Sequence, residues 1–132
     1  MLKTGILHPQ LARIMAEIRH MDTLVIGDAG LPIPKGVERV DLGWKEGSPA
    51  YLEVLEEILK YMVVEKATFA TEAKTVSPAF HHKAVALLPK GLPVNYISHA
   101  ELKEQSKSAK VIILTGEFTP YTNVILVAGC AY

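Results

Sequence analysis

The sequence predicts an α/β layered domain in which helices flank a largely parallel central sheet. Segments with helical periodicity alternate along the chain with short segments rich in β-branched and aromatic residues, the order that parallel βαβ units produce. The two most apolar segments, residues 111–114 and 124–127, are apolar at every position. Strands of that kind are covered by helices on both faces of a sheet. No repeat, low-complexity tract or linker divides the 132 residues, so we expect one domain, residues 1–132.

The first half of the chain predicts two helices and three strands. Apolar residues at helical spacing and a proline at the first position indicate a helix from about Pro9 to His20. Residues 23–26 predict a buried strand, and the glycines and prolines of residues 27–36 predict a loop. We then expect a strand over residues 37–42, a helix capped by Ser48 that runs from Pro49 to about Lys60, and a strand over residues 63–70.

The second half continues the alternation. Ser77 and Pro78 predict the start of a helix that ends near Leu88, and residues 94–97 predict a short strand. Ser98 and Glu101 form a capping box, which places His99 in the first turn of a further helix. The strands over residues 111–114 and 124–127 complete the sheet.

The composition argues against several classes of partner. The chain has 14 Lys and Arg and 14 Asp and Glu residues, so its formal net charge is zero. Nucleic acids and acidic membranes attract basic proteins, and we therefore expect neither as a partner. The single cysteine, Cys130, excludes a disulfide framework and a cysteine-based zinc cage. Because no membrane-spanning segment or signal peptide is visible, we expect a cytoplasmic protein.

Three polar clusters fit the place where ligands collect in open α/β sheets, beyond the carboxyl ends of the strands. The first comprises residues 20–23 and Asp28, on either side of the first strand. The second is His99, directly after the strand over residues 94–97, and the third is residues 119–123, between the last two strands. We therefore expect a binding site built from these clusters.

His20 and His99 are expected at opposite ends of their helices. The helix dipole would favour the imidazolium form of His20 at a C-terminus and the neutral form of His99 at an N-terminus. One histidine biased towards acid and one towards base would suit proton transfer between two oxygens. The alternative, equally open at this point, is that each histidine only caps or packs.

Asp28, Tyr121 and Asn123 offer groups that suit a polyol. Asp28 can accept hydrogen bonds from sugar hydroxyls or hold His20 in one tautomer, while Tyr121 and Asn123 supply a ring and a two-sided amide. Taken singly, each is also explained as a turn residue. The sequence has no phosphate or dinucleotide loop, no serine-nucleophile motif and no histidine pair at metal-binding spacing. These absences argue less against an acid–base enzyme without a cofactor than against the other classes, and they argue against a catalytic metal.

Residues 20–34, HMDTLVIGDAGLPIP, closely resemble the N-terminal signature of the ribose pyranase and fucose mutarotase family. The resemblance continues through residues 40–42, the segment 47–49, the pair Ser98–His99 and the segments from 115 to 129, so it spans nearly the whole chain. One departure is Arg19, where relatives often carry glycine. The residues after Asp28, Ala-Gly-Leu-Pro, favour the ribose branch, because fucose mutarotases tend to have Ala-Asn-Phe-Pro there.

This resemblance implies a cofactor-free isomerase that interconverts the pyranose and furanose forms of D-ribose. In such a protein the histidine that matches His20 is the proton donor. The residues that match Asp28, His99, Tyr121, Thr122 and Asn123 bind the sugar. The resemblance also implies a ring-shaped homo-oligomer, commonly a homodecamer of two stacked pentamers, with sites at the subunit boundaries.

The chemistry of ring opening is compatible with these residues. A base takes the anomeric O–H proton and an acid protonates the ring oxygen, after which closure runs the same transfers in reverse. We expect His20 as the acid, while the base is open between His99 and Asp28. Three other functions remain possible: an L-fucose mutarotase, a non-catalytic ribose-binding regulatory protein, and a ring-forming structural protein.

Overall fold

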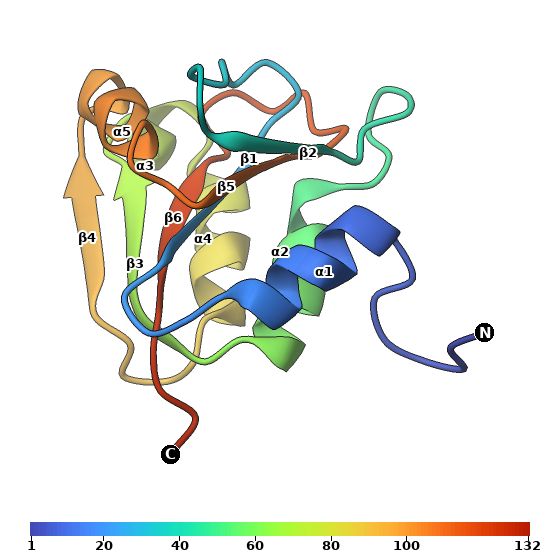
Figure 1. Ribbon diagram of the computed structural model, residues 1–132. Helices are drawn as coiled ribbons and strands as arrows, with labels where there is room; N and C mark the ends of the chain where they lie inside the picture. Colours follow the sequence, from blue (N-terminus) through green and yellow to red (C-terminus); the bar gives the residue numbers. More distant parts are fainter.

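The computed structural model describes all 132 residues, and its centre is one six-stranded sheet (Figure 1). Each strand lies within one residue of its predicted bounds at either end. The strands are β1 (Thr23–Gly27), β2 (Glu38–Asp41), β3 (Val64–Ala70), β4 (Val94–Ile97), β5 (Val111–Leu114) and β6 (Val124–Ala128). Their order across the sheet is β2-β5-β1-β6-β3-β4. Five strands run parallel and β6 runs antiparallel to both of its neighbours, so the prediction of a largely parallel sheet is confirmed.

Five helices cover the two faces of this sheet (Figure 1). Their bounds are α1 (Pro9–Glu17), α2 (Tyr51–Tyr61), α3 (Ala73–Val76), α4 (Pro78–Leu87) and α5 (His99–Ser106). The larger apolar core joins one face of the sheet to α1, α2 and α4, and the smaller core joins the other face to α5. The short α3 was not expected. None of the five is long and apolar enough to cross a membrane.

The sheet is apolar on both faces because helices cover both. In β1, Leu24 and Ile26 point into the larger core while Val25 between them points into the smaller one. Successive side chains of a strand face opposite sides of the sheet. All three residues are fully buried, which accounts for strands that are apolar at every position.

Two helix boundaries differ from the prediction. Helix α1 ends at Glu17, so His20 lies in the turn after the helix and not at its C-terminus. Helix α2 begins at Tyr51 with Ala50 as its N-cap, and not at Ser48–Pro49. The hydroxyl of Ser48 instead accepts a hydrogen bond from the indole Nε1 of Trp44 at 3.0 Å, within a tight turn. That hydroxyl is therefore used locally and does not cap the helix.

The other two predicted caps differ from one another. Ser98 is the N-cap of α5, and its hydroxyl accepts a hydrogen bond from the amide of Glu101 at 3.1 Å, which confirms that end of the capping box. Ser77 occupies the N-cap position of α4, but its hydroxyl donates to the carbonyl of Pro120 at 3.0 Å. Ser77 therefore ties α4 to the segment before β6.

Gly116 lies where two loops meet. It follows β5, its carbonyl accepts a hydrogen bond from the amide of Gly47, and its amide donates to the carbonyl of Pro49 at 2.9 Å. A Cβ atom at this position would come within 2.5 Å of the backbone nitrogen and oxygen of Ser48. No side chain fits there, because backbone atoms cannot move aside as the end of a flexible side chain can.

We therefore expect Gly116→Ala to lower the free energy of unfolding by about 1–3 kcal/mol, the usual range for overpacking a filled site. Gly30→Ala is the matched control, since its Cβ would meet nothing closer than 3.6 Å. Urea unfolding of both variants measures the difference. Equal stability of the two variants would show that the 45–48 turn can move away from Gly116.

Candidate functional site

The centre of the candidate site is a pair of hydrogen bonds between Asp28 and Asn123. Asp28 follows β1 directly, and Asn123 precedes β6. The amide of Asp28 donates to the side-chain oxygen of Asn123 at 3.0 Å, and the side-chain nitrogen of Asn123 donates to the Asp28 carboxylate at 3.1 Å. Asn123 is completely buried. Both of its side-chain polar atoms therefore serve to hold Asp28.

Burial raises the pKa of the Asp28 carboxyl above its ordinary value. Hydrogen bonds from the amide of Gly30 and from Asn123, together with the nearby His99, act in the opposite direction. An acid whose pKa is raised by folding destabilises the native state while it is ionised, and this destabilisation disappears as the pH falls through its folded pKa. Asp28 thus lowers stability at neutral pH, as is common for residues kept for function.

His99 and Tyr121 form the other half of the cluster. Their rings meet edge to face, with centroids 5.0 Å apart and an interplanar angle of 85°. Tyr121 has a φ of 61°, a conformation that is rare outside glycine and that turns the chain sharply before β6. The Nδ1 atom of His99 is buried and has no partner within the protein. Its capacity for a hydrogen bond is thus unused within the protein.

Thr122 is buried between Tyr121 and Asn123, and its hydroxyl donates to the carbonyl of Thr119 at 2.9 Å. That hydrogen bond closes the turn. The structure thus brings Asp28, His99, Tyr121 and Asn123 together at the carboxyl ends of the parallel strands, with Thr122 supporting the turn beside them.

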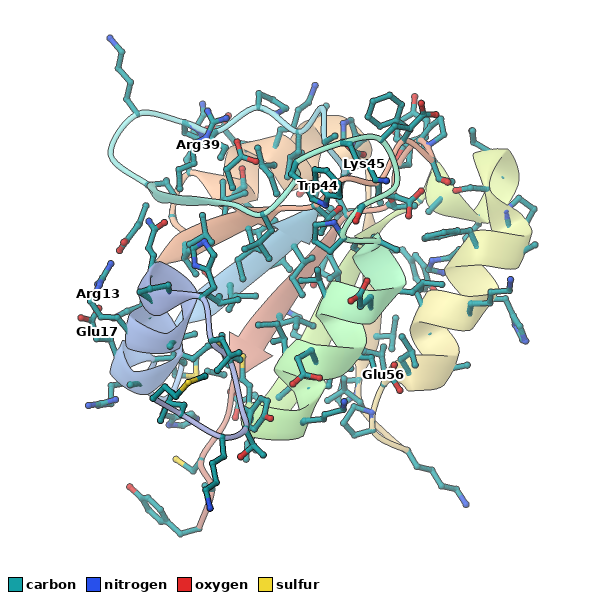
Figure 2. The ribbon with its side chains drawn as sticks, turned by 90° about the vertical axis from the view of Figure 1, so that its right-hand side faces the viewer. Arg13, Glu17, Arg39, Trp44, Lys45 and Glu56 are labelled. Carbon is teal, nitrogen blue, oxygen red and sulfur yellow. The ribbon has the colours of Figure 1, made fainter.

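A hollow of about 380 Å³ opens beside Asp28, and its other walls are Gly30 and the segment from Glu117 to Pro120. Trp44 and Lys45 lie at the same end of the sheet, in the segment that connects β2 to α2 (Figure 2). The Lys45 ammonium is 4.7 Å from the centre of the Trp44 ring. Trp44 and Phe118 line a second hollow next to the first and are both exposed.

Sequence reasoning missed three residues that support this cluster. The Glu117 carboxylate accepts hydrogen bonds from the backbone amides of Thr119 and Tyr51, and so joins the turn to the start of α2. The Glu72 carboxylate accepts from the amide of His99. Tyr51 is buried with its hydroxyl unpaired within the protein, and burial together with the charge of Asp28 raises its pKa. The contacts to the amides of Tyr51 and His99 are long-range, and no local sequence pattern indicates them.

His20 does not join the cluster within one chain. It precedes β1, whereas Asp28 follows it, so the two residues lie at opposite ends of the sheet. The five residues of β1 separate them by about 16 Å at the usual rise per residue. The expectation that His20 lies beyond the carboxyl ends of the strands is therefore wrong, because residues before a parallel strand lie at its amino end.

At its own end of the sheet, His20 borders a hollow of about 270 Å³ together with Tyr61, Cys130 and Tyr132. Its Nε2 atom lies 3.1 Å from a carboxylate oxygen of Glu65, and the two side chains are 50% and 40% exposed. A pair this exposed contributes at most about 1 kcal/mol to stability. The imidazole therefore remains accessible to a ligand or to another chain.

No group of three His, Cys, Asp or Glu side chains is placed to hold a metal ion. The cluster instead offers one half-buried carboxylate, one imidazole without a protein hydrogen bond at Nδ1, and a phenol ring. Groups of these kinds bind hydroxyls and transfer protons. Fold and site together define a mixed α/β protein with a cluster of polar groups, of kinds able to bind hydroxyls, at the carboxyl edge of its sheet.

The chain belongs to the RbsD / FucU transport protein family, whose model matches residues 1–131. It is 48% identical to the D-ribose pyranase of Laribacter hongkongensis, over the full length of both chains. Among solved structures it is similar to Bacillus subtilis RbsD complexed with D-ribose, with a TM-score of 0.95 and 42% identity over all of both chains. It is also similar to FucU from Bifidobacterium longum, with a TM-score of 0.80 and 26% identity over 94% of each chain.

We expect Asn123→Ala to lower the free energy of unfolding by about 1–3 kcal/mol, because it leaves the buried amide of Asp28 without its acceptor. Asn95→Ala is the matched control, since Asn95 is exposed on the edge strand β4. Chemical denaturation compares the two variants. A stability loss at Asn95 as large as that at Asn123 would contradict the importance of the Asp28–Asn123 pair.

Proposed function

We propose that this protein is an isomerase that interconverts the pyranose and furanose forms of D-ribose, as part of carbohydrate metabolism. The observation that carries the assignment is full-length similarity to D-ribose pyranases at up to 48% identity. The similarity to an RbsD structure complexed with D-ribose, at a TM-score of 0.95, supports ribose as the ligand. Both similarities extend over the full length of the chain.

The polar cluster supports a binding role for Asp28, His99, Tyr121, Thr122 and Asn123. We assign to Asp28 the task of orienting sugar hydroxyls, because both of its carboxylate oxygens already accept N–H bonds that fix its position. We assign the base to His99, whose Nδ1 has no partner in the protein. A neutral imidazole can take the anomeric O–H proton and return it on closure, with no cofactor involved.

The acid, His20, then has to come from a second copy of the chain. Within one chain, His20 and Asp28 are separated by the length of β1, which is too far for one small sugar to bridge. A head-to-tail arrangement would bring the His20 end of one copy to the Asp28 end of its neighbour. Contacts of this type form rings when the rotation between successive copies closes. We propose a ring-shaped homo-oligomer, a homodecamer of two pentamers, with a site at each such boundary.

The surface supports this assembly. Large apolar side chains are exposed at both ends of the sheet: Trp44 and Phe118 at the end of Asp28, and Met21, Tyr61 and Val63 at the end of His20. Exposed apolar patches at two separate places on one chain suit a contact between unlike surfaces. We place this assembly in the cytoplasm, as the sequence predicts.

Two alternative functions are distinguished by experiment. An L-fucose mutarotase would share the fold, but the identity to FucU, 26%, is well below that to RbsD, 42%. A non-catalytic ribose-binding protein would bind the sugar and leave its rate of ring exchange unchanged. Rate measurements with both sugars separate all three functions.

We expect the protein to accelerate exchange between the pyranose and furanose signals of D-ribose in magnetisation-transfer NMR, more than it accelerates exchange of L-fucose. His20→Ala should lower the accelerated exchange rate about 10²-fold or more, because one positioned proton transfer contributes a factor of that size. His82→Ala, at an exposed histidine on α4, is the matched control. Absence of acceleration by the folded wild-type protein would refute the enzyme assignment.

We expect two inactive variants, His20→Ala and His99→Ala, to restore activity when their chains are co-expressed in one oligomer. In a randomly mixed ring, about a quarter of the boundaries would pair an intact His20 with an intact His99. The measurement is the ribose exchange rate of the mixed oligomer relative to wild type. A mixture no more active than its two components would show that the site does not lie between chains.

A further inference from the structure

The corner between β3 and α3 holds the backbone on both sides of Ser98. The amide and the hydroxyl of Thr71 donate to the carbonyl of Ile97 at 2.7 and 3.1 Å. The next residue, Glu72, accepts the amide hydrogen of His99 with both carboxylate oxygens, at 3.0 and 2.9 Å. The consecutive residues Thr71 and Glu72 thus hydrogen-bond to the backbone of Ile97 and His99, the two residues that flank the N-cap of α5.

Little else determines where the His99 imidazole lies. Its Nδ1 atom is buried without a partner in the protein, and the contact that orients the ring is the edge-to-face contact with Tyr121. The position of the ring therefore depends on the backbone of His99 more than on bonds of the ring itself. Glu72 is the side chain that holds that backbone.

The charge of Glu72 also favours its contact with the amide of His99. Hydrogen bonds from the amide of His99 hold the pKa of the Glu72 carboxyl below its ordinary value, so Glu72 is ionised at neutral pH. A carboxylate at the first amide of a helix is stabilised by the helix dipole. The ionised carboxylate of Glu72 thus holds the first turn of α5 through charge-assisted hydrogen bonds from the amide of His99.

We propose that Glu72 is a positioning residue that sets the His99 imidazole for the ligand through the backbone amide of His99. The proposal rests on the proposed function, in which His99 contacts the sugar. Glu72 itself need not touch the ligand, because its carboxylate is directed at the helix and not at the hollow beside Asp28. The role that we assign to Glu72 is therefore to position His99, and not to transfer a proton.

The chain offers a matched control for this proposal. The hydroxyl of Ser98 also caps the first turn of α5, but it accepts from the amide of Glu101 and not from that of His99. Ser98→Ala and Glu72→Ala each remove one cap from the same helix. If Glu72 has a purely structural role, the two variants should change the His99 imidazole equally. If Glu72 is a positioning residue, only Glu72→Ala should displace that imidazole.

The first readout does not depend on catalysis. We expect Glu72→Ala to shift the imidazole NMR signals of His99 and to weaken the nuclear Overhauser effect between the His99 and Tyr121 rings. Ser98→Ala should leave both readouts as in wild type, although it also lowers thermal stability. Equal changes in the two variants, or no change in Glu72→Ala, would overturn the proposal.

The second readout is the exchange of ribose. We expect Glu72→Ala to reduce kcat/KM about tenfold, since a small displacement of a positioned group has effects of that size or larger, and Ser98→Ala to stay within about twofold of wild type. Glu72→Gln keeps an oxygen acceptor for the His99 amide and should retain most of the activity. A Glu72→Gln variant as impaired as Glu72→Ala would contradict action through that amide.

The two readouts also separate this proposal from the proposed function. If the wild-type protein fails to accelerate ribose exchange, the enzyme assignment fails, while the ring signals of His99 still report whether Glu72 positions the imidazole. If wild type is active and the His99 signals do not respond to Glu72→Ala, the positioning role fails and the enzyme assignment stands.

Discussion

The reversed direction of β6 is the constraint on which the site depends. β6 pairs with β1 on one side and with β3 on the other, and so joins the two parallel groups of strands into one sheet. Because it runs against its neighbours, its first residue lies at the edge where theirs end (Figure 1). The turn that leads from β5 into β6 stays at that edge as a result. Asn123 reaches Asp28 for this reason.

Three side chains then tie separate segments together at that edge through backbone amides. Asn123 holds the amide of Asp28, Glu117 holds the amide of Tyr51, and Glu72 holds the amide of His99. Each acceptor comes from a segment far away in the sequence. Polar contacts thus fix the loop after β1 and the start of α2 to the turn before β6, and the start of α5 to the corner after β3. The apolar cores fix the sheet and helices beneath them.

The strands were predictable because their signal is local. Burial on both faces requires apolar residues at consecutive positions, and the bounds of the fully buried β5 match the expected segment. Helix starts were less predictable, since the side chains that looked like caps had tertiary partners: Ser48 bonds Trp44, and Ser77 bonds the carbonyl of Pro120. The end of α1 at Glu17 likewise moved His20 out of its expected helix.

The grouping of Asp28, His99, Tyr121 and Asn123 was predictable from the rule that the carboxyl ends of parallel strands meet at one edge. The same rule, applied to a residue before a strand, places His20 at the other edge. Glu72 was not predictable, because its partner amide lies 27 residues away in the sequence. Glu117 was not predictable either, since the amide of Tyr51 is 66 residues from it.

The hydrogen bonds to the amides of Asp28, Tyr51 and His99 also affect the free energy of ligand binding. A loop that orders only when its ligand arrives loses conformational entropy at that moment, and the loss weakens binding. Here the segments that carry Asp28, Tyr51 and His99 are held in place by hydrogen bonds made within the folded chain. Their entropy is lost during folding, so the contacts made to a ligand at this edge would translate more fully into affinity.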